Sequence, residues 1–167
     1  MKSLFFEEEH DLFRSTLQDF FKAEVTPYIN EWEKNGKVDR SVLKKMGEMG
    51  FLGLEVEEKY GGMGAGFMYS MILLEEMGRT GSCCFATVVS GHAYLAMNYL
   101  IHAGSPFIKE KYLVPSVTGE KIGSLSMTEP FAGSDLRAIR TTAKLEGDHY
   151  IVAVSYTHLT LPTICSV

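Results

Sequence analysis

The sequence predicts a mainly α-helical chain, with an amino-terminal helical bundle over residues 1–120 and the first strands of an incomplete β-barrel-like domain over residues 121–154. In the first part, apolar residues recur at three- and four-residue steps, as they do on the buried faces of helices. The connections between these stretches are short, which favours antiparallel packing into a bundle. From Lys121 onward the pattern changes to short apolar runs around a turn sequence, which is typical of strands.

The first helix is expected over residues 7–32. Its apolar positions at helical spacing are Phe13, Leu17, Phe20, Phe21, Val25, Tyr28, Ile29 and Trp32. Because Pro27 lacks a backbone donor, we expect a kink near Thr26. Asp39 is expected to cap a second helix, which Gly50 closes. The inward residues of this second helix are expected to be Val42, Leu43, Met46 and Met49.

Three further helices complete the expected bundle. They span residues 67–77 before Gly78, residues 85–102, and residues 107–117 before Gly119. Between the last two, Gly104, Ser105 and Pro106 have the order of a stop, a cap and a first-turn proline.

Three strands are expected beyond the bundle. The short apolar run of residues 122–127 is expected to form the first of them. Residues 140–145 and 149–154 flank Glu146, Gly147 and Asp148 as strands flank a hairpin turn.

Composition and charge limit the class of function. The chain is 46% hydrophobic and 22% charged, close to the average for globular proteins, so we expect it to fold as a soluble protein. A net charge of -5 without a clustered Lys/Arg excess gives no reason to expect a nucleic-acid partner. Residues 83–103 are the most apolar window, but polar side chains such as His92 and Asn98 interrupt it, so we expect a buried helix and no membrane span.

The termini and cysteines bear on the compartment. Residues 1–11 carry Glu7, Glu8 and Glu9 in place of the basic region and apolar core of a secretory signal, so no such signal is expected. Its cysteines, Cys83, Cys84 and Cys165, have neither metal-site nor redox-pair spacing. We therefore expect free, buried thiols and a cytoplasmic location.

A glycine-rich stretch over residues 61–66 has two interpretations. A nucleotide-binding loop requires a buried strand before it, but residues 55–60 are charged, which argues against that function. We expect a linking loop instead.

The segment from Leu125 to Asp135 is the most informative for chemistry. An apolar run leads there into a loop dense in hydroxyls, small residues and a proline, which would present side-chain donors and backbone N–H groups to a ligand. Taken alone, the segment is a polar binding loop or an ordinary surface turn.

Spaced motifs decide between these alternatives. In the second part of the chain they are Thr128-Glu129-Pro130, Ala132-Gly133-Ser134-Asp135, Thr141-Thr142-Ala143 and Gly147-Asp148-His149-Tyr150-Ile151. In the first part they are Glu9-His10-Asp11, Glu31-Trp32-Glu33-Lys34, Gly50-Phe51-Leu52-Gly53, Lys59-Tyr60-Gly61-Gly62, Leu74-Glu75-Glu76 and Lys111-Tyr112-Leu113. Over residues 4–152 the chain resembles the acyl-CoA dehydrogenases, and within them it is most similar to the long-chain branch.

The resemblance implies an FAD-dependent oxidation of acyl-CoA thioesters to trans-2-enoyl-CoA, as in fatty-acid β-oxidation. It implies that Leu125, Ser126, Met127 and Thr128 line the flavin, with the Thr128 hydroxyl donating to the flavin ring. It also implies that Gly133 permits close backbone approach, and that Ser134 lies beside the FAD pyrophosphate and the acyl-CoA substrate. An electron-transfer flavoprotein as electron acceptor and a homotetrameric parent are expected on the same ground.

The catalytic base is not expected among these residues. In the family the glutamate of this motif, here Glu129, belongs to the loop scaffold, and the base comes from a later helical domain. Adjacent Glu75 and Glu76 on a helix are expected to be solvated or paired. The histidines His10, His92, His102 and His149 lack ligand spacing, so no metal site is expected.

Two features depart from the family pattern. Phe131 stands where the family usually has glycine, so either this position is not left-handed or the loop is reshaped. Residues 155–167 match nothing in the pattern, and we interpret them as an artificial or frame-shifted terminus that resequencing would test. We expect the chain to be a fragment without turnover, with exposed apolar faces that favour aggregation.

Two other functions are compatible with the sequence. An acyl-CoA oxidase of the same fold, which uses oxygen directly, would share the motifs from Thr128 to Ser134. A non-catalytic helical module that binds a partner protein is the alternative from a different class, and the flavin-loop residues count against it.

Overall fold

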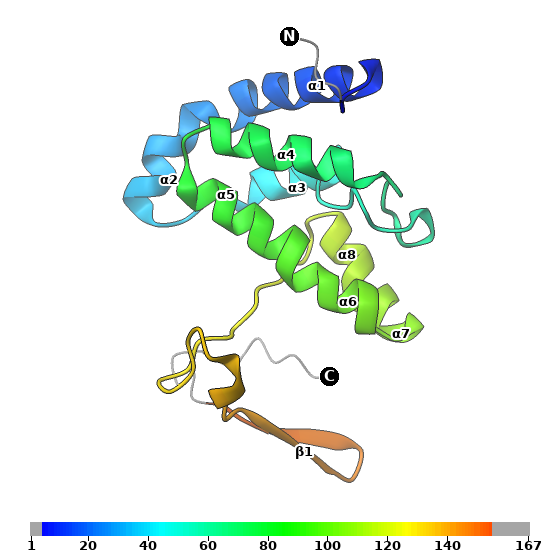
Figure 1. Ribbon diagram of the computed structural model, residues 1–167, viewed down its shortest axis with the longest axis vertical. Helices are drawn as coiled ribbons and strands as arrows, with labels where there is room; N and C mark the ends of the chain where they lie inside the picture. Colours follow the sequence, from blue (N-terminus) through cyan, green and yellow to red (C-terminus); the bar gives the residue numbers. More distant parts are fainter. Residues whose placement is uncertain (1–4, 155–167) are drawn as a thin grey trace. The chain divides into compact units, whose positions relative to one another are not determined.

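The computed structural model describes residues 5–154 of the 167-residue chain. The described residues divide into two compact units, residues 5–125 and residues 126–154 (Figure 1). The first unit is helical and the second contains a β-hairpin, in agreement with the predicted fold class. The terminus interpreted as artificial, residues 155–167, and Cys165 within it lie outside the described residues.

The helical unit combines α-helices with short 3-10 turns and π-helical segments. Its α-helices are α1 (Glu8–Glu24), α2 (Ile29–Asn35), α3 (Arg40–Glu48), α4 (Phe67–Arg79), α5 (Cys83–Ser90), α6 (Met97–Ala103), α7 (Pro106–Ile108) and α8 (Val114–Val117). Two short 3-10 turns are η1 (Thr26–Tyr28) and η2 (Glu58–Tyr60). Two segments with π-helical hydrogen bonding, η3 (Gly91–Ala96) and η4 (Lys109–Leu113), join α5 to α6 and α7 to α8. The predicted fourth and fifth helices are therefore two continuous helical runs, each containing a π turn.

Most of the predicted helix caps and breaks are confirmed. The first helix breaks at η1, where Pro27 occupies the first turn. The Asp39 carboxylate caps α3 by accepting a hydrogen bond from the Ser41 amide at 2.7 Å. The Ser105 hydroxyl accepts from the Ile108 amide ahead of α7.

Three details of the predicted helices are wrong. Gly78 does not end the third helix, because α4 continues to Arg79 and the left-handed residue is Gly81, with a φ of 74°. Tyr28 and Met49 were expected to point inward but are 46% and 49% exposed. Each of these two lies where the regular helix gives way to a turn, so the periodicity of the sequence no longer describes which side chain points inward.

Aromatic side chains join the helices of the main core. The Phe85 ring of α5 lies 5.5 Å from the Phe21 ring of α1 and 6.1 Å from the Trp32 ring of α2, measured between centroids. All three side chains are buried. Aromatic pairs at these distances add to the stabilisation that comes from burial, so α1, α2 and α5 are held through one contact point.

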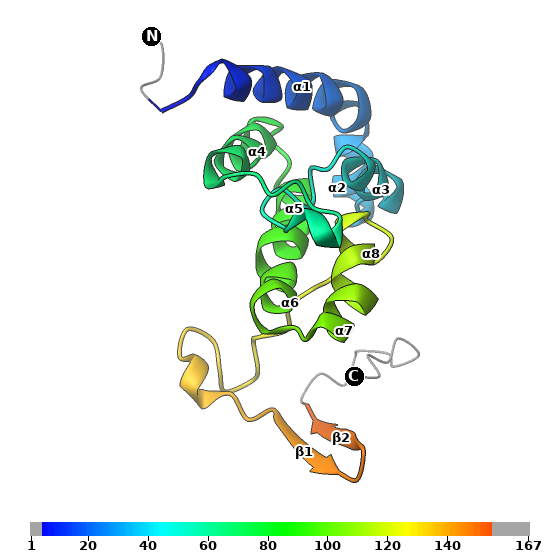
Figure 2. The ribbon, with the colours of Figure 1, turned by 90° about the vertical axis from the view of Figure 1, so that its right-hand side faces the viewer.

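Helices α1 and α4 lie side by side (Figures 1 and 2). Charged side chains join them. Glu76 is 3% exposed, and its carboxylate accepts hydrogen bonds from the Arg14 guanidinium and, at 3.0 Å, from the Gln18 amide. Arg14 also pairs with Glu75 at 2.8 Å, and Arg79 pairs with both glutamates. Glu75 and Glu76 were expected to be solvated or paired, and both are paired with arginines.

The second unit contains a two-stranded antiparallel sheet of β1 (Thr142–Glu146) and β2 (His149–Ala153), preceded by the 3-10 turn η5 (Leu136–Ala138) (Figure 2). Glu146 pairs with His149, so Gly147 and Asp148 form the predicted turn. Gly147 has a φ of 66°, which fits the first central position of a type II′ hairpin turn. Residues 122–127 do not form the expected strand, because the structure places no hydrogen-bonding partner strand beside them within residues 5–154.

The helical run Cys83–Ala103 is long and apolar enough to cross a membrane by length and composition, a test that core helices of soluble proteins also pass. Its buried side chains include Phe85, Val89, His92 and Met97, which pack inside the helical unit. Within the described residues, Cys83 and Cys84 are free thiols, as expected, but the prediction that they are buried is wrong, because Cys83 is exposed and Cys84 is only partly buried.

The position of Glu76 gives a prediction for stability. Replacing Arg14 by Met should lower the free energy of unfolding by about 1–3 kcal/mol, because a buried carboxylate loses its best partner. Arg79 is exposed and pairs with the same two glutamates. Replacing it by Met should lower the free energy of unfolding by less than about 1 kcal/mol. Urea denaturation of both variants checks this, and an equal loss would show that burial of Glu76 does not decide the effect.

Candidate functional site

In the sequence, the residues expected to bind flavin fall on either side of the division between the two units, after residue 125. Leu125 is the last residue of the first unit and is half-buried. The others belong to the second unit and are exposed: Ser126, Met127, Thr128, Gly133 and Ser134. The hydroxyls at 126, 128 and 134 are therefore accessible to a ligand from the solvent side.

A tight turn shapes the middle of this segment. The amide of Glu129 donates to the carbonyl of Ala132 at 2.9 Å, and the amide of Ala132 donates back at 3.1 Å. Pro130 and Phe131 form the corner between them, and Ala132 is 1% exposed. No residue other than glycine has a positive φ within residues 5–154, so Phe131 is not left-handed. Of the two outcomes expected for Phe131, the first is the one observed.

The carboxylate of Glu129 accepts three hydrogen bonds from residues of the same unit. Its Oε2 accepts from the Arg140 amide at 2.7 Å, and its Oε1 accepts from the Thr141 amide at 2.9 Å and from the Thr141 hydroxyl. The Thr141 hydroxyl, followed by the Arg140 amide, lowers the pKa of Glu129. This carboxylate therefore joins the turn to the residues that precede β1, and it is poorly suited to take up a proton from a substrate.

Gly133 has unobstructed space where a side chain would begin. Its φ is not positive, and a Cβ built at this residue would meet nothing within 4 Å. The contacts within the described residues therefore do not require glycine at this position. A ligand that approaches the backbone closely would require it.

His92 is a buried residue near the start of this segment that is not among the predicted site residues. Its ring is fully buried, with Nε2 3.1 Å from the Ser116 carbonyl of α8 and Nδ1 accepting from the Gly123 amide at 3.0 Å. Burial lowers the pKa of His92, and the hydrogen bond with Ser116 acts in the opposite direction. The sequence pattern shows only that His92 lies within an apolar helical stretch. That pattern does not indicate which residues its ring contacts.

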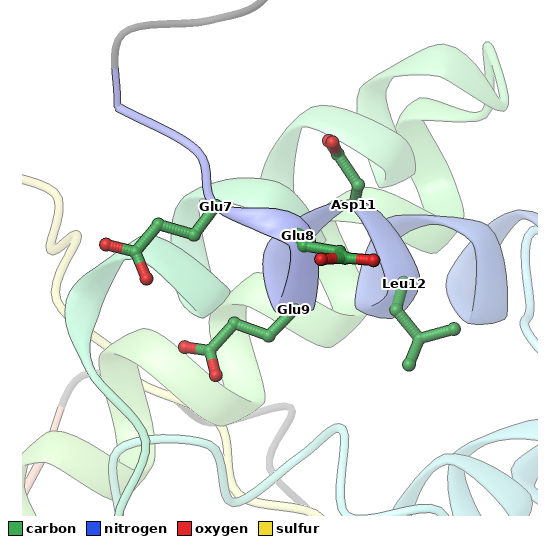
Figure 3. Close-up of a pocket in the computed structure, with 5 residues that line it drawn as sticks. All are labelled: Glu7, Glu8, Glu9, Asp11 and Leu12. Atoms are coloured by element: carbon green, nitrogen blue, oxygen red, sulfur yellow. The ribbon is translucent and has the colours of Figure 1, made fainter.

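A hollow on the surface of the helical unit lies at the start of α1 (Figure 3). It is lined by Glu7, Glu8, Glu9, Asp11 and Leu12. In Figure 3 the Glu7 and Glu9 carboxylates point to one side while Asp11 points away from them. Across residues 5–154 no three His, Cys, Asp or Glu side chains come together as metal ligands would.

Comparison with known proteins places these features in a family. The sequence pattern of the family described as "Acyl-CoA dehydrogenase, N-terminal domain" matches residues 7–120. The chain is 39% identical over 155 residues to the mitochondrial long-chain specific acyl-CoA dehydrogenase of Mus musculus, covering 93% of this chain and 36% of that protein.

Solved structures agree with this match. The acyl-CoA dehydrogenase of Geobacillus kaustophilus superposes with a TM-score of 0.84 at 43% identity, covering 90% of this chain and 39% of that one. The acyl-CoA dehydrogenase of Bacillus anthracis, solved in complex with FAD, gives a TM-score of 0.82 at 33% identity, covering 91% of this chain and 26% of that one. The chain thus spans a little over a third of the length of the mouse relative, or 36%.

The hydrogen bonds of Glu129 give a prediction for its titration. Because its pKa is lowered from 4.5, the bonds to residues 140 and 141 should be fully present above pH 4.5 and should be lost as the pH falls through the lowered value. Carbon-detected NMR titration of the Glu129 carboxyl measures the midpoint.

The same titration in two variants identifies the cause. Replacing Thr141 by Val removes the hydroxyl donor and should raise the midpoint of Glu129 toward 4.5. Replacing the neighbouring Thr142 by Val should leave the midpoint unchanged, since no hydrogen bond joins its side chain to Glu129. An unchanged midpoint in the Thr141 variant would contradict the assignment.

Proposed function

The chain belongs to the acyl-CoA dehydrogenase family, and on that premise we propose that it supplies the helical domain and the flavin-contacting loop of an FAD-dependent enzyme that oxidises acyl-CoA thioesters to enoyl-CoA. The observation that supports this proposal most is the loop of residues 125–134. The hydroxyls at 126, 128 and 134 are exposed, and no described residue lies within 4 Å of the position that a Cβ at Gly133 would take.

The residues present fit a flavin. FAD, when bound, accepts the β hydrogen of the substrate as a hydride. Leu125, Ser126, Met127 and Thr128 would contact the flavin ring, and the Thr128 hydroxyl would donate to it and so stabilise negative charge on the reduced ring. Gly133 would let the backbone approach the cofactor, and Ser134 would donate a hydrogen bond to the pyrophosphate and to the acyl-CoA.

Glu129 is a scaffold residue in this proposal. Its carboxylate already accepts from two backbone amides and one hydroxyl, and its pKa is lowered, so it is a weak base. The base that removes the α proton of the substrate would come from the part of the enzyme that corresponds to the unmatched length of the relatives.

The partners follow from the same family membership. We expect electrons to pass to an electron-transfer flavoprotein and the whole enzyme to form a homotetramer. The cytoplasmic location stays a prediction, since the mouse relative is named as a mitochondrial protein.

The test begins with the complete reading frame that contains these residues. The purified protein should be yellow, should release FAD on denaturation, and should convert an acyl-CoA to its enoyl product with a flavoprotein or a dye as acceptor. A colourless protein that takes up no added FAD would overturn the proposal. Rapid turnover with oxygen alone would instead assign the activity of an acyl-CoA oxidase.

Gly133 allows binding to be separated from folding. Replacing Gly133 by Ala should weaken FAD binding about tenfold or more, and Gly133→Val should weaken it further, because the added carbons enter the space of the ligand. Stability should change by less than about 0.5 kcal/mol, since an added Cβ meets nothing within 4 Å.

Gly78→Ala is the matched control for these variants. Gly78 lies in α4, its φ is not positive, and its Cβ position is equally open. This variant should bind FAD as the unmodified protein does. Isothermal titration of the apoprotein with FAD, alongside thermal unfolding, measures both quantities. Unchanged FAD affinity in both Gly133 variants would argue against contact between the loop and the cofactor.

A further inference from the structure

The buried ring of His92 forms hydrogen bonds with two residues that lie later in the sequence, Ser116 and Gly123. It lies on the π-helical segment η3, and its exposed fraction is 0%. The Gly123 amide can only donate, so Nδ1 of His92 accepts and carries no proton. The remaining proton is on Nε2, which donates to the Ser116 carbonyl at 3.1 Å. The two partners therefore fix one tautomer of a neutral imidazole.

A second contact holds Gly123 against the same helical segment. A Cβ added at Gly123 would lie 2.8 Å from the Cβ of Ala96 and 3.7 Å from Nδ1 of His92. A real side chain does not tolerate the first of these distances, so any residue larger than glycine would push the chain away from η3. Gly123 is therefore in contact with both ends of one π turn, His92 near its start and Ala96 at its end.

The π turn accounts for the direction of His92. The Met97 amide donates to the His92 carbonyl, five residues earlier, in place of the usual four. Such turns are rare and are frequently found at functional sites. Here the extra residue lets both His92 and Met97 be buried, with exposed fractions of 0% and 1%.

Protonation would disrupt this arrangement. Burial lowers the pKa of His92, so the ring is neutral at physiological pH. A proton on Nδ1 would face the Gly123 amide proton and remove the hydrogen bond. The neutral form is thus the one that positions Gly123.

We propose that His92 is a positioning residue for the flavin-contacting loop: its neutral ring fixes the backbone of Gly123, two residues before Leu125, and so sets where residues 125–128 begin. This inference rests on the proposed function. It assigns to His92 no contact with substrate or cofactor, and it predicts that loss of the Gly123 hydrogen bond weakens FAD binding beyond the effect of lost stability.

Two substitutions separate the two hydrogen bonds of the ring. In His92→Asn the side-chain oxygen replaces Nδ1 as acceptor for the Gly123 amide, but the side chain is too short to reach Ser116. In His92→Gln the side-chain amide replaces Nε2 as donor to Ser116, but no acceptor faces Gly123. Both variants lose a buried ring, so both should have a similarly lowered melting temperature.

The measurements are made on the protein from the complete reading frame. Hydrogen exchange of the Gly123 amide and the affinity for FAD are compared in the two variants. We expect His92→Asn to keep Gly123 protected and to bind FAD within about threefold of the unmodified protein, and His92→Gln to lose protection and bind about tenfold more weakly. Equal exchange at Gly123 in the two variants, or equal FAD affinity, would overturn the inference.

His10 supplies the matched control. It is also a buried histidine, 9% exposed, whose Nδ1 accepts from a backbone amide, that of Glu7 at 3.1 Å. His10→Asn and His10→Gln should change stability without separating Gly123 exchange or FAD affinity. If the unmodified protein binds no FAD, the proposed function fails, while the exchange of Gly123 still decides whether His92 positions it.

Discussion

The contact of Phe85 with Phe21 and Trp32 is the constraint on which the arrangement of the helical unit depends. It fixes the start of the run Cys83–Ala103 against α1 and α2. Because a continuous helical run is stiff, this contact also determines which residues the run presents further along, where η3 meets Ser116 and Gly123. The path of the chain as it leaves the helices is thus a distant consequence of aromatic packing in the core.

The helices were predictable because their determinants are local. Caps such as Asp39 and Ser105 act within three residues, and apolar periodicity is read within one helix. The errors lie where local signals end. Met49 and Tyr28 continue an apolar pattern beyond the regular helix and are exposed. The expected strand over residues 122–127 has strand-like composition, but strands are stabilised by pairing, and pairing depends on residues far along the chain.

The candidate loop was predictable in composition and not in geometry. The resemblance assigned Glu129 to the scaffold, but its donors lie 11 and 12 residues away in the sequence, and no periodicity connects them. The link from His92 to Gly123 spans 31 residues. The open space beside Gly133 likewise depends on where the surrounding residues lie in three dimensions, which the sequence pattern does not indicate.

The additional residue in η3 changes the phase of the helix that contains it. In a regular α-helix, side chains five positions apart point about 140° away from each other. With the π turn, His92 and Met97 both face the interior. Deleting one residue between 93 and 96 would restore regular winding and leave the orientation of α6 unchanged, because the π turn accommodates one residue more than a regular helix along the same path. Inserting one further residue, by contrast, would turn all of α6 by about 100° and carry Met97 away from the interior, so this segment should tolerate a single deletion better than an insertion.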